Sequence, residues 1–341
     1  GLLDENMGDT CPQSIIDALP DYTADEIREA YDELYELKKA GQLFAQDDYI
    51  DVSRYIPVNA PVKALCLHVA HDCNLRCQYC FASTGDFGQG RKIMPPEIAK
   101  KAIDFVIARS GVRHNIEVDF FGGEPLMAWD TVTQTVDYAR SLEEKYNKKF
   151  RFTITTNGLL LDEDKRKYIN ENMDNCVLSL DGRREVNDEF RKTVAGTGSY
   201  DTIVPKFKAL VDERDPNLDY YARGTFTSHN LDFAEDVLSI ADAGFDRLSV
   251  EPVTADPGCG YDLTEDDLPK IEAEYDRLTD IMLERKKEGK PLTFFHFMVD
   301  LDQGPCVVKR LRGCGAGYEY VAVTPDGDIY PCHQFVGKEE F

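Results

Sequence analysis

The sequence predicts an α/β protein built around a parallel β-sheet, with a different kind of structure at each end. Six short apolar runs alternate with helical stretches after Lys63, which is the pattern of successive βα units. The runs are almost continuously apolar, as expected for strands buried on both faces of a parallel sheet. Residues 11–55 and the residues after about 303 break this alternation. We therefore expect three regions, over residues 1–60, 61–302 and 303–341.

The first region contains two predicted helices. The stretch TADEIREAYDELYELKKAG opens with a capping box, Thr23 and Glu26, and ends at Gly41. Its apolar residues recur at helical spacing: Ile27, Tyr31, Leu34 and Leu37. PQSIIDAL predicts a shorter helix before it, and LFAQDDYIDV (43–52) predicts a strand pair after it. Two helices followed by a small hairpin resemble part of a winged helix-turn-helix.

The central region consists of the predicted βα units. The strand candidates are ALCLHVA (64–70), IEVDFFGG (116–123), RFTITTNG (151–158), CVLSLDG (176–182), DYYARGTFT (219–227) and DRLSVEPV (246–253). The helix candidates lie near 95–109, 129–147, 162–172, 200–213, 231–243 and 265–288, the last with Thr264 as its cap. Periodicity leaves open whether the sheet closes into a barrel. In either architecture, functional residues collect where the carboxyl ends of the strands meet their loops.

The third region is rich in Cys and Gly. The stretch YEYVAVTPDGDIYPC (318–332) predicts a β-hairpin that turns at Pro325, Asp326 and Gly327. The chain stops at VGKEEF without a visible end to this element, so we expect the natural protein to continue.

The charge of the chain is strongly acidic. It has 63 acidic and 39 basic residues and a net charge of -24. A surface this negative repels phosphate backbones, so we expect no nucleic-acid partner. The charge serves either solubility alone or the attraction of a basic partner.

Nothing in the sequence indicates a membrane protein. It has no run of 18 apolar residues, and the start, GLLDENMGDT, lacks the basic flank and apolar core of a signal peptide. We therefore expect a cytoplasmic protein without a membrane partner. In a reducing compartment, its ten cysteines are metal ligands, catalytic thiols or buried small side chains rather than disulfides.

Three cysteines follow the first predicted strand within eight residues. Cys73, Cys77 and Cys80 are spaced C-x3-C-x2-C, which puts three thiols in one loop at the carboxyl edge of the sheet. A [4Fe–4S] cluster has four irons, so three thiolates leave one iron without a protein ligand. That iron is free to bind a small molecule.

A zinc site is the alternative for this loop. His68 or His71 could complete a Cys3His site, which is common in short Cys-rich loops. Tyr79 and Phe81 argue against zinc, because they are bulky aromatic residues in a loop where a zinc knuckle needs only turns.

The spacing Cys73-x3-Cys77-x-Tyr79-Cys80 resembles the C-x3-C-x-aromatic-C signature of radical S-adenosylmethionine (SAM) enzymes. The resemblance implies a partial (β/α)6 TIM-type barrel over residues 61–302. It implies that the vacant iron chelates the amino nitrogen and the carboxylate of SAM, and that an electron from the reduced cluster cleaves SAM to a 5′-deoxyadenosyl radical. It also implies that Tyr79, on the adenine side, and Phe81 bind the cofactor.

The second predicted strand ends in FFGGEPLM. Gly122 and Gly123 permit close approach to the main chain, and Glu124 can accept hydrogen bonds from an ammonium group. A tight turn between strand and helix would explain the same residues. In radical SAM enzymes this GGE element holds the amino group of SAM, and here it follows one βα unit after the cysteine loop.

Further cofactor contacts are implied by the resemblance at later strand ends. Ser179 in LSLDG, with Arg191 twelve residues on, corresponds to a pair that contacts the ribose and carboxylate of SAM. Asn157 and Arg223 also fall at strand ends, where each could instead be a turn residue or part of a surface ion pair. Val253 is expected to contact adenine.

The third region resembles the start of a SPASM extension, which binds auxiliary iron–sulfur clusters. Cys314-x12-Gly327-x4-Cys332 fits its C-x9-15-G-x4-C opening, and Cys306 is the candidate third ligand. The remaining cysteines of such an extension are absent, so we expect a truncated domain with one or more auxiliary [4Fe–4S] clusters in the complete protein.

Residues 63–341 resemble SPASM-type radical SAM enzymes that modify peptides, and above all the maturases of six-cysteine (SCIFF) peptides, which form thioether links. The tail CGAGYEYVAVTPDGDIYPCHQFVG and the N-terminal helices carry this resemblance. It implies that residues 1–60 are part of a winged-helix-like recognition element that binds the leader of a cysteine-rich precursor peptide as an added strand. It also implies an electron donor such as ferredoxin or flavodoxin.

Two other functions stay open. Sulfatase-maturing relatives have an acidic proton acceptor directly after the cysteine at position 332, whereas this chain has His333, so formylglycine formation is the second choice and His333 is the one catalytic candidate. A zinc-binding winged-helix regulator is the non-enzyme alternative. The net charge of -24 and the six βα units argue against it.

Overall fold

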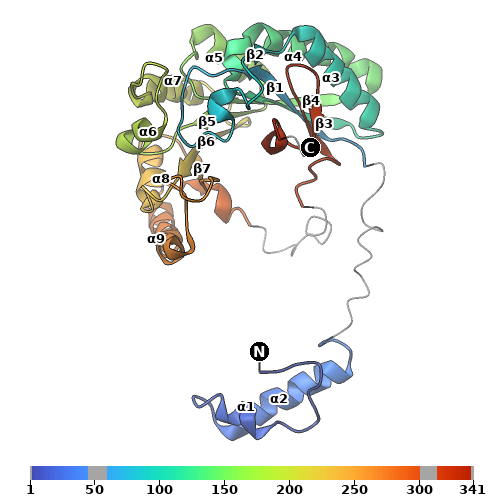
Figure 1. The fold of residues 1–341 in the computed structure, drawn as a ribbon, viewed down its shortest axis with the longest axis vertical. Helices are drawn as coiled ribbons and strands as arrows, with labels where there is room; N and C mark the ends of the chain where they lie inside the picture. Colours follow the sequence, from blue (N-terminus) through green and yellow to red (C-terminus); the bar gives the residue numbers. More distant parts are fainter. Residues whose placement is uncertain (1, 45–59, 300–312, 339–341) are drawn as a thin grey trace. The chain divides into compact units, whose positions relative to one another are not determined.

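The computed structural model describes residues 2–44, 60–299 and 313–338 and consists of two compact units, residues 1–57 and 58–341 (Figure 1). The first unit contains α1 (Gln13–Asp17) and α2 (Ala24–Lys39). The predicted capping box is confirmed, because the Thr23 hydroxyl accepts a hydrogen bond from the Glu26 amide and the Glu26 carboxylate accepts one from the Thr23 amide. Of the predicted strand pair at 43–52, residues 45–52 lie outside the described residues.

The second unit is built on one sheet that stays open. Its strand order is β10-β9-β1-β3-β4-β5-β6-β7-β8, and β2 (Lys92–Ile93) pairs with β1 at its end. The six predicted strands are all present: β1 (Ala64–His71), β3 (Asn115–Gly122), β4 (Lys149–Thr156), β5 (Asn175–Ser179), β6 (Asp219–Phe226) and β7 (Arg247–Pro252). Each is parallel to the next, and together they curve into a partial barrel (Figure 1).

The helices lie along the outer side of the curved sheet (Figure 1). They are α3 (Pro96–Arg109), α4 (Trp129–Tyr146), α5 (Glu163–Asn172), α6 (Arg184–Phe190), α7 (Tyr200–Asp212), α8 (Phe233–Asp242) and α9 (Leu268–Lys287). Sequence periodicity predicts all of these except α6, which has only seven residues and is too short to show a repeat. None of the helices in the described ranges is long and apolar enough to cross a membrane.

The main hydrophobic core lies between the sheet and the helices. On β4, Phe150, Phe152 and Ile154 are buried in this core, whereas Thr153 and Thr155 alternate with them and are only half-buried. The same alternation along β5 to β7 gives the inner face of the barrel polar side chains. Polar residues on this face are therefore available for a ligand at the carboxyl ends of the strands.

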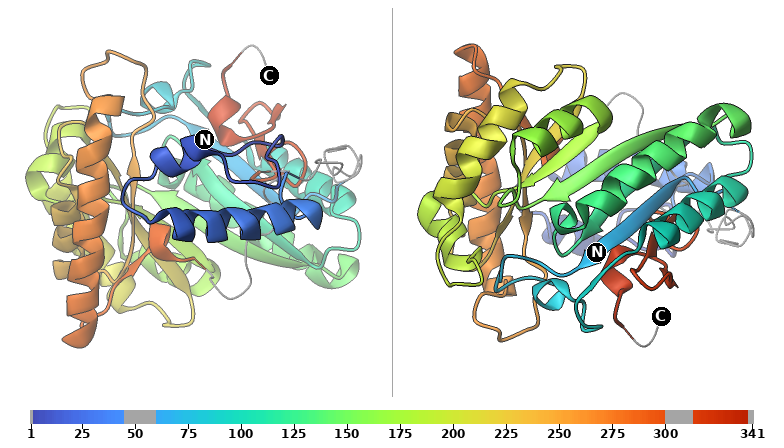
Figure 2. Two further views of the ribbon diagram at one scale, coloured as in Figure 1. Left: turned by 90° about the horizontal axis from the view of Figure 1, so that it is seen from below. Right: turned by 90° about the horizontal axis from the view of Figure 1, so that it is seen from above.

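The C-terminal hairpin pairs with the barrel. The predicted hairpin is confirmed, with β9 (Tyr320–Val323) antiparallel to β10 (Ile329–Tyr330) and Gly327 at φ 93° in the turn. The sequence does not predict that β9 also runs parallel to β1, with Ala64 opposite Tyr320 (Figure 2). At the opposite edge, β8 (Thr293–Phe294) pairs with β7.

Candidate functional site

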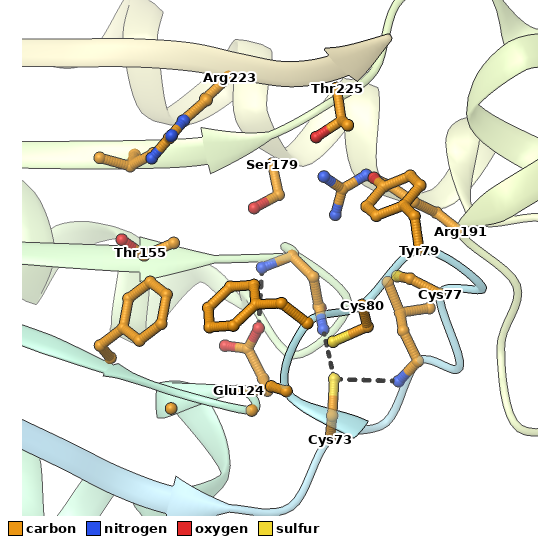
Figure 3. Close-up of a pocket in the computed structure, with 18 of the residues that line it drawn as sticks. Cys73, Cys77, Tyr79, Cys80, Glu124, Thr155, Ser179, Arg191, Arg223 and Thr225 are labelled. Atoms are coloured by element: carbon orange, nitrogen blue, oxygen red, sulfur yellow. Dashed lines mark hydrogen bonds between the residues drawn. The ribbon is translucent and has the colours of Figure 1, made fainter. Parts of the chain in front are cut away.

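One pocket opens at the carboxyl ends of the barrel strands (Figure 3). Its lining includes the three cysteines of the loop after β1: Cys73, Cys77 and Cys80. It also includes every residue that the sequence predicts to bind SAM: Tyr79, Phe81, Gly122, Gly123, Glu124, Asn157, Ser179, Arg191, Arg223 and Val253. The parallel order of the strands brings these distant residues to one edge of the sheet.

The cysteine loop is held against the end of β3. The Gly123 amide donates to the Ala70 carbonyl at 2.7 Å, and the Glu124 amide donates to the Asp72 carbonyl at 2.9 Å. The Cys73 sulfur accepts hydrogen bonds from the Leu75 amide at 3.3 Å and the Asn157 side-chain amide at 3.5 Å (Figure 3). These donors are arranged to stabilise a thiolate at this position.

Burial keeps two of the thiols protonated in the absence of a cation. It raises the pKa of Cys73 to about 12 and the pKa of Cys77 to about 11. A bound metal reverses this preference, because a thiolate is the ligand and the cation offsets the cost of its burial. The buried thiols are therefore suited to metal ligation rather than to free nucleophilic chemistry.

The arrangement fits a cluster better than a single zinc ion. His68 Nδ1 lies 3.2 Å from His71 Nε2, and neither imidazole lines the pocket. Within residues 2–44, 60–299 and 313–338, no three His, Cys, Asp or Glu side chains are grouped around one ion position. Neither histidine of the alternative Cys3His site therefore lies in the pocket, whereas the three loop thiols that line it match the donor set of a [4Fe–4S] cluster with an open iron.

The two glycines at the end of β3 are needed for packing. A Cβ on Gly122 would lie 2.2 Å from the Ala70 oxygen, and a Cβ on Gly123 would lie 2.2 Å from the Asp72 oxygen. Both contacts are with backbone that cannot move without displacing the cysteine loop. The structural reason for the GG pair is therefore the close packing of two chain segments below the pocket.

We expect Gly123→Ala to destabilise the second unit by about 1–3 kcal/mol, because the new methyl group forces the cysteine loop away from β3. Differential scanning calorimetry measures the change. Gly196→Ala is the control: the space around Gly196 is open and only its φ of +78° opposes a side chain. Equal melting temperatures for the two variants would contradict this packing role.

Glu124 is fully buried beneath the pocket. Its Oε1 accepts hydrogen bonds from the Thr156 hydroxyl at 2.8 Å and the Leu126 amide at 3.0 Å, and its Oε2 accepts one from the Asn157 amide at 2.8 Å. Burial nevertheless raises the pKa of Glu124 to about 7. A buried carboxylate with this pKa gains most from a cationic ligand, which would stabilise its charged form.

Arg191 is paired with an acidic residue that the sequence did not single out. Asp181, fully buried at the end of LSLDG, lies 3.0 Å from Arg191 Nε and accepts a hydrogen bond from the Tyr79 hydroxyl at 2.6 Å. The Arg191 guanidinium also lies 5.6 Å from the centre of the Tyr79 ring. Asp181 therefore fixes two of the predicted cofactor contacts. The feature of the sequence that could have indicated Asp181 is its position two residues after Ser179.

Arg223 and Ser179 point into the pocket from the inner face of the barrel (Figure 3). The Arg223 carbonyl accepts a hydrogen bond from the Leu180 amide, but its guanidinium makes no hydrogen bond or ion pair among the described residues. A cation in this position is available to an anionic or carbonyl group of a ligand. The pocket is also lined by Thr155, Thr225 and Glu251, which were not predicted from the sequence. Their alternation with buried residues along the strands could have indicated that they face the inside of the barrel.

The C-terminal hairpin contributes His333 to the pocket wall. The Tyr320 hydroxyl lies 3.0 Å from His333 Nδ1, and the ring is 5.1 Å from that of Phe121 and 5.8 Å from that of Phe81. Burial lowers the pKa of His333 to about 4, so its imidazole is neutral at pH 7. Cys332 is half-buried beside it.

The predicted auxiliary ligands are not brought into the pocket. Cys314 is exposed, and neither it nor Cys332 lines the cavity with the three loop cysteines. Cys306 lies outside the described residues. The assignment of these three cysteines to an auxiliary cluster stays a prediction.

The chain is similar to several known proteins. Residues 67–222 match the model of the Radical SAM superfamily. The radical SAM cyclopropyl synthase TigE of Paramaledivibacter caminithermalis is 29% identical over 53% of this chain and 40% of its own length. A cysteine-type anaerobic sulfatase-maturating enzyme of Clostridium novyi is 25% identical over 79% of this chain and 72% of its own length. The chain spans 40–63% of the length of three curated relatives, which are TigE and uncharacterised proteins of Archaeoglobus fulgidus and Methanocaldococcus jannaschii.

Solved structures share the fold. The enzyme anSMEcpe with bound AdoMet and Cp18Cys peptide superposes with a TM-score of 0.65 at 22% identity, over 81% of this chain and 75% of that one. Streptococcus suis SuiB bound to S-adenosylmethionine gives a TM-score of 0.59 at 18% identity, over 96% and 72%. Residues 67–222 therefore resemble a radical SAM domain, and the chain is similar in sequence to the radical SAM enzyme TigE and to a sulfatase-maturating enzyme.

Proposed function

We propose that this protein is a peptide maturase that joins a cysteine sulfur to a carbon of another residue as a thioether. The observation that carries the proposal is the identity of the residue directly after Cys332, which lines the pocket. It is His333, neutral and held by Tyr320, where an acidic residue is expected for formylglycine formation. A second residue of the substrate peptide would be the acceptor of the sulfur.

The residues of the pocket divide into two groups in this proposal. Cys73, Cys77 and Cys80 would hold the cluster, which with SAM supplies a 5′-deoxyadenosyl radical that removes a hydrogen atom from carbon. Glu124 would receive the amino group of SAM. Arg191 would bind its carboxylate, and the hydrogen bond from Tyr79 to Asp181 would keep the adenine side of the site in place.

The substrate is inferred to be a cysteine-rich precursor peptide. The sequence resemblance of residues 1–60 to part of a leader-binding element supports this inference, and α1 and α2 lie in this region. Cys306, Cys314 and Cys332 would ligate an auxiliary cluster that accepts an electron, and a ferredoxin or flavodoxin would reduce the first cluster. Each of these partners is part of the proposal.

Mass spectrometry of a co-expressed precursor peptide tests the function. A thioether gives a loss of two hydrogens per link that persists after alkylation of the remaining thiols. In parallel, anaerobically reconstituted protein with SAM and dithionite should yield 5′-deoxyadenosine. Colourless protein that contains one zinc and forms no 5′-deoxyadenosine would refute the enzyme function, and unmodified thiols would refute the thioether.

Formylglycine formation is the second candidate function. The Clostridium novyi sulfatase-maturating enzyme, which is similar over 79% of this chain, favours it. A sulfatase-derived peptide with the target cysteine distinguishes the two: an aldehyde that reacts with a hydrazide probe indicates formylglycine, whereas a thioether product contains no carbonyl group.

The pKa of Glu124 predicts how SAM binding depends on pH. At pH 6 most of the carboxyl groups are protonated, since the pKa is about 7, and a proton must leave before both oxygens of the carboxylate can accept hydrogen bonds from the amino group of SAM. We expect SAM affinity to rise by about tenfold between pH 6 and pH 8. Calorimetric titration in buffers of different ionisation enthalpy also reports the released proton. For Glu124→Gln the dependence should disappear, and an unchanged slope would exclude this carboxylate.

A further inference from the structure

A chain of hydrogen bonds leads from the pocket into the protein through Glu251. Glu251 lies near the end of β7, and its Oε1 accepts from the Ser249 hydroxyl at 2.5 Å. Its Oε2 lies 2.8 Å from His296 Nε2, and the Tyr275 hydroxyl lies 2.8 Å from His296 Nδ1. Strand β7 supplies Ser249 and Glu251, whereas the helix α9 and the 3-10 turn after β8 (Phe295–Phe297) each supply one member.

The order of the hydrogen-bonded groups decides which of them can take a proton from the substrate. Glu251 lines the pocket, whereas His296 and Tyr275 do not, so the carboxylate is the member that can meet a substrate. With the Tyr275 hydroxyl donating to Nδ1, the imidazole carries its hydrogen on Nε2 and donates it to Glu251. The side chains of Glu251 and His296 are 27% and 22% exposed, so the pair is enclosed without being sealed from water.

The carboxylate is held in its charged form. Burial raises the pKa of Glu251, but the hydrogen bonds from Ser249 and His296 and the nearby charges of His296 and Arg223 outweigh burial and lower the pKa overall. The groups that face Glu251 are Arg223 from β6, His296 from the turn after β8 and Tyr275 from α9 behind it. No ion pair with Arg or Lys occupies this carboxylate among the described residues.

A proton acceptor is required by the balance of the reaction. Joining R–SH to R′–H as R–S–R′ removes two hydrogens. One leaves carbon as a hydrogen atom and forms 5′-deoxyadenosine. The S–H bond would lose its proton to a base, the thiolate sulfur would bond to the carbon radical, and an iron–sulfur cluster held by the cysteines would take up the surplus electron. The hydrogen atom and the electron are taken up by the cofactors. The acceptor of the proton must therefore be a side chain of the pocket or water.

We propose that Glu251 accepts the proton of the substrate thiol and that His296, as a positioning residue, holds the carboxylate in place through its Nε2–H. This rests on the proposed function. The Glu251 side chain is 27% exposed, so water can take the proton on and return the carboxylate to its charged form. His333, which also lines the pocket, is the competing acceptor.

The test compares variants of the full chain with its clusters reconstituted. We expect Glu251→Gln to lower the rate of thioether formation by about 10²–10⁴-fold. Formation of 5′-deoxyadenosine should stay within about threefold, because SAM cleavage precedes proton removal. His296→Gln should lower the rate less and shift its pH profile. Glu189→Gln removes a carboxylate from another Glu–His pair, Glu189 with His229, that does not line the pocket, and should match the wild type.

A second readout does not depend on turnover. In the complex without SAM, iodoacetamide should alkylate the target cysteine of the peptide more slowly with wild-type protein than with Glu251→Gln, because the neighbouring carboxylate charge lowers the equilibrium thiolate fraction. Full thioether formation by Glu251→Gln, or a large loss for His333→Gln with none for Glu251→Gln, would overturn the assignment. Wild-type protein that makes 5′-deoxyadenosine but no thioether would instead refute the proposed function.

Discussion

Cys73→Ala, Cys77→Ala and Cys80→Ala should each abolish the formation of 5′-deoxyadenosine. The three thiols line one pocket, and each has to supply a separate iron with a ligand, so the loss of any one leaves a second iron without protein support. We expect a decrease of at least about 10³-fold, to the background of the assay, since no step of the reaction begins without the cleavage of SAM. Chromatography of the nucleoside and the iron and sulfide content of the protein measure the effect.

Cys259→Ala is the matched control for these variants. Cys259 follows β7 on the same side of the barrel, but its thiol is exposed and does not line the pocket. Its removal should leave iron content and SAM cleavage at the wild-type level. A variant of Cys73, Cys77 or Cys80 that retains full activity would show that the loop does not hold the cluster.

The sequence predicts most of the barrel because each strand can be recognised locally, as a short apolar run. Each predicted strand matches a strand of the structure to within about three residues at either end, and the chain order of the strands is also their order in the sheet from β1 to β7. A parallel βα repeat leaves few other topologies open. The predicted cofactor residues meet in one pocket for the same reason, because most of them lie at or just after the carboxyl ends of these strands.

Pairings over long distances in the sequence were not predictable in this way. The hairpin of β9 and β10 is visible from its turn, but the contact of β9 with β1 joins residues more than 250 positions apart and leaves no periodic signal. Asp181 and Glu251 were missed for a related reason. Each has its role through partners on other elements, Arg191 and Tyr79 for the first and His296 for the second, and the sequence shows only its position on or near a predicted strand.

Asp181→Asn should strongly destabilise the second unit, because it removes one charge of a buried ion pair. Asp181 is fully buried and the Arg191 side chain is 11% exposed, so the substitution leaves a buried guanidinium without its counter-charge. Breaking a buried pair in this way costs about 3–5 kcal/mol. We expect the melting temperature to fall by on the order of 10 °C. The Tyr79 hydroxyl also loses its charged acceptor, so the cysteine loop should become less ordered.

Asp201→Asn provides the matched control, since Asp201 also pairs with an arginine, Arg184, but the two side chains are 64% and 60% exposed. Its loss should cost at most about 1 kcal/mol. The double variant Asp181→Asn with Arg191→Gln should recover part of the stability, because it removes the unpaired charge, yet SAM binding should stay weak without the guanidinium in the pocket. Equal stability of Asp181→Asn and Asp201→Asn would mean that water reaches Arg191. A double variant that binds SAM normally would show that Arg191 serves the fold alone.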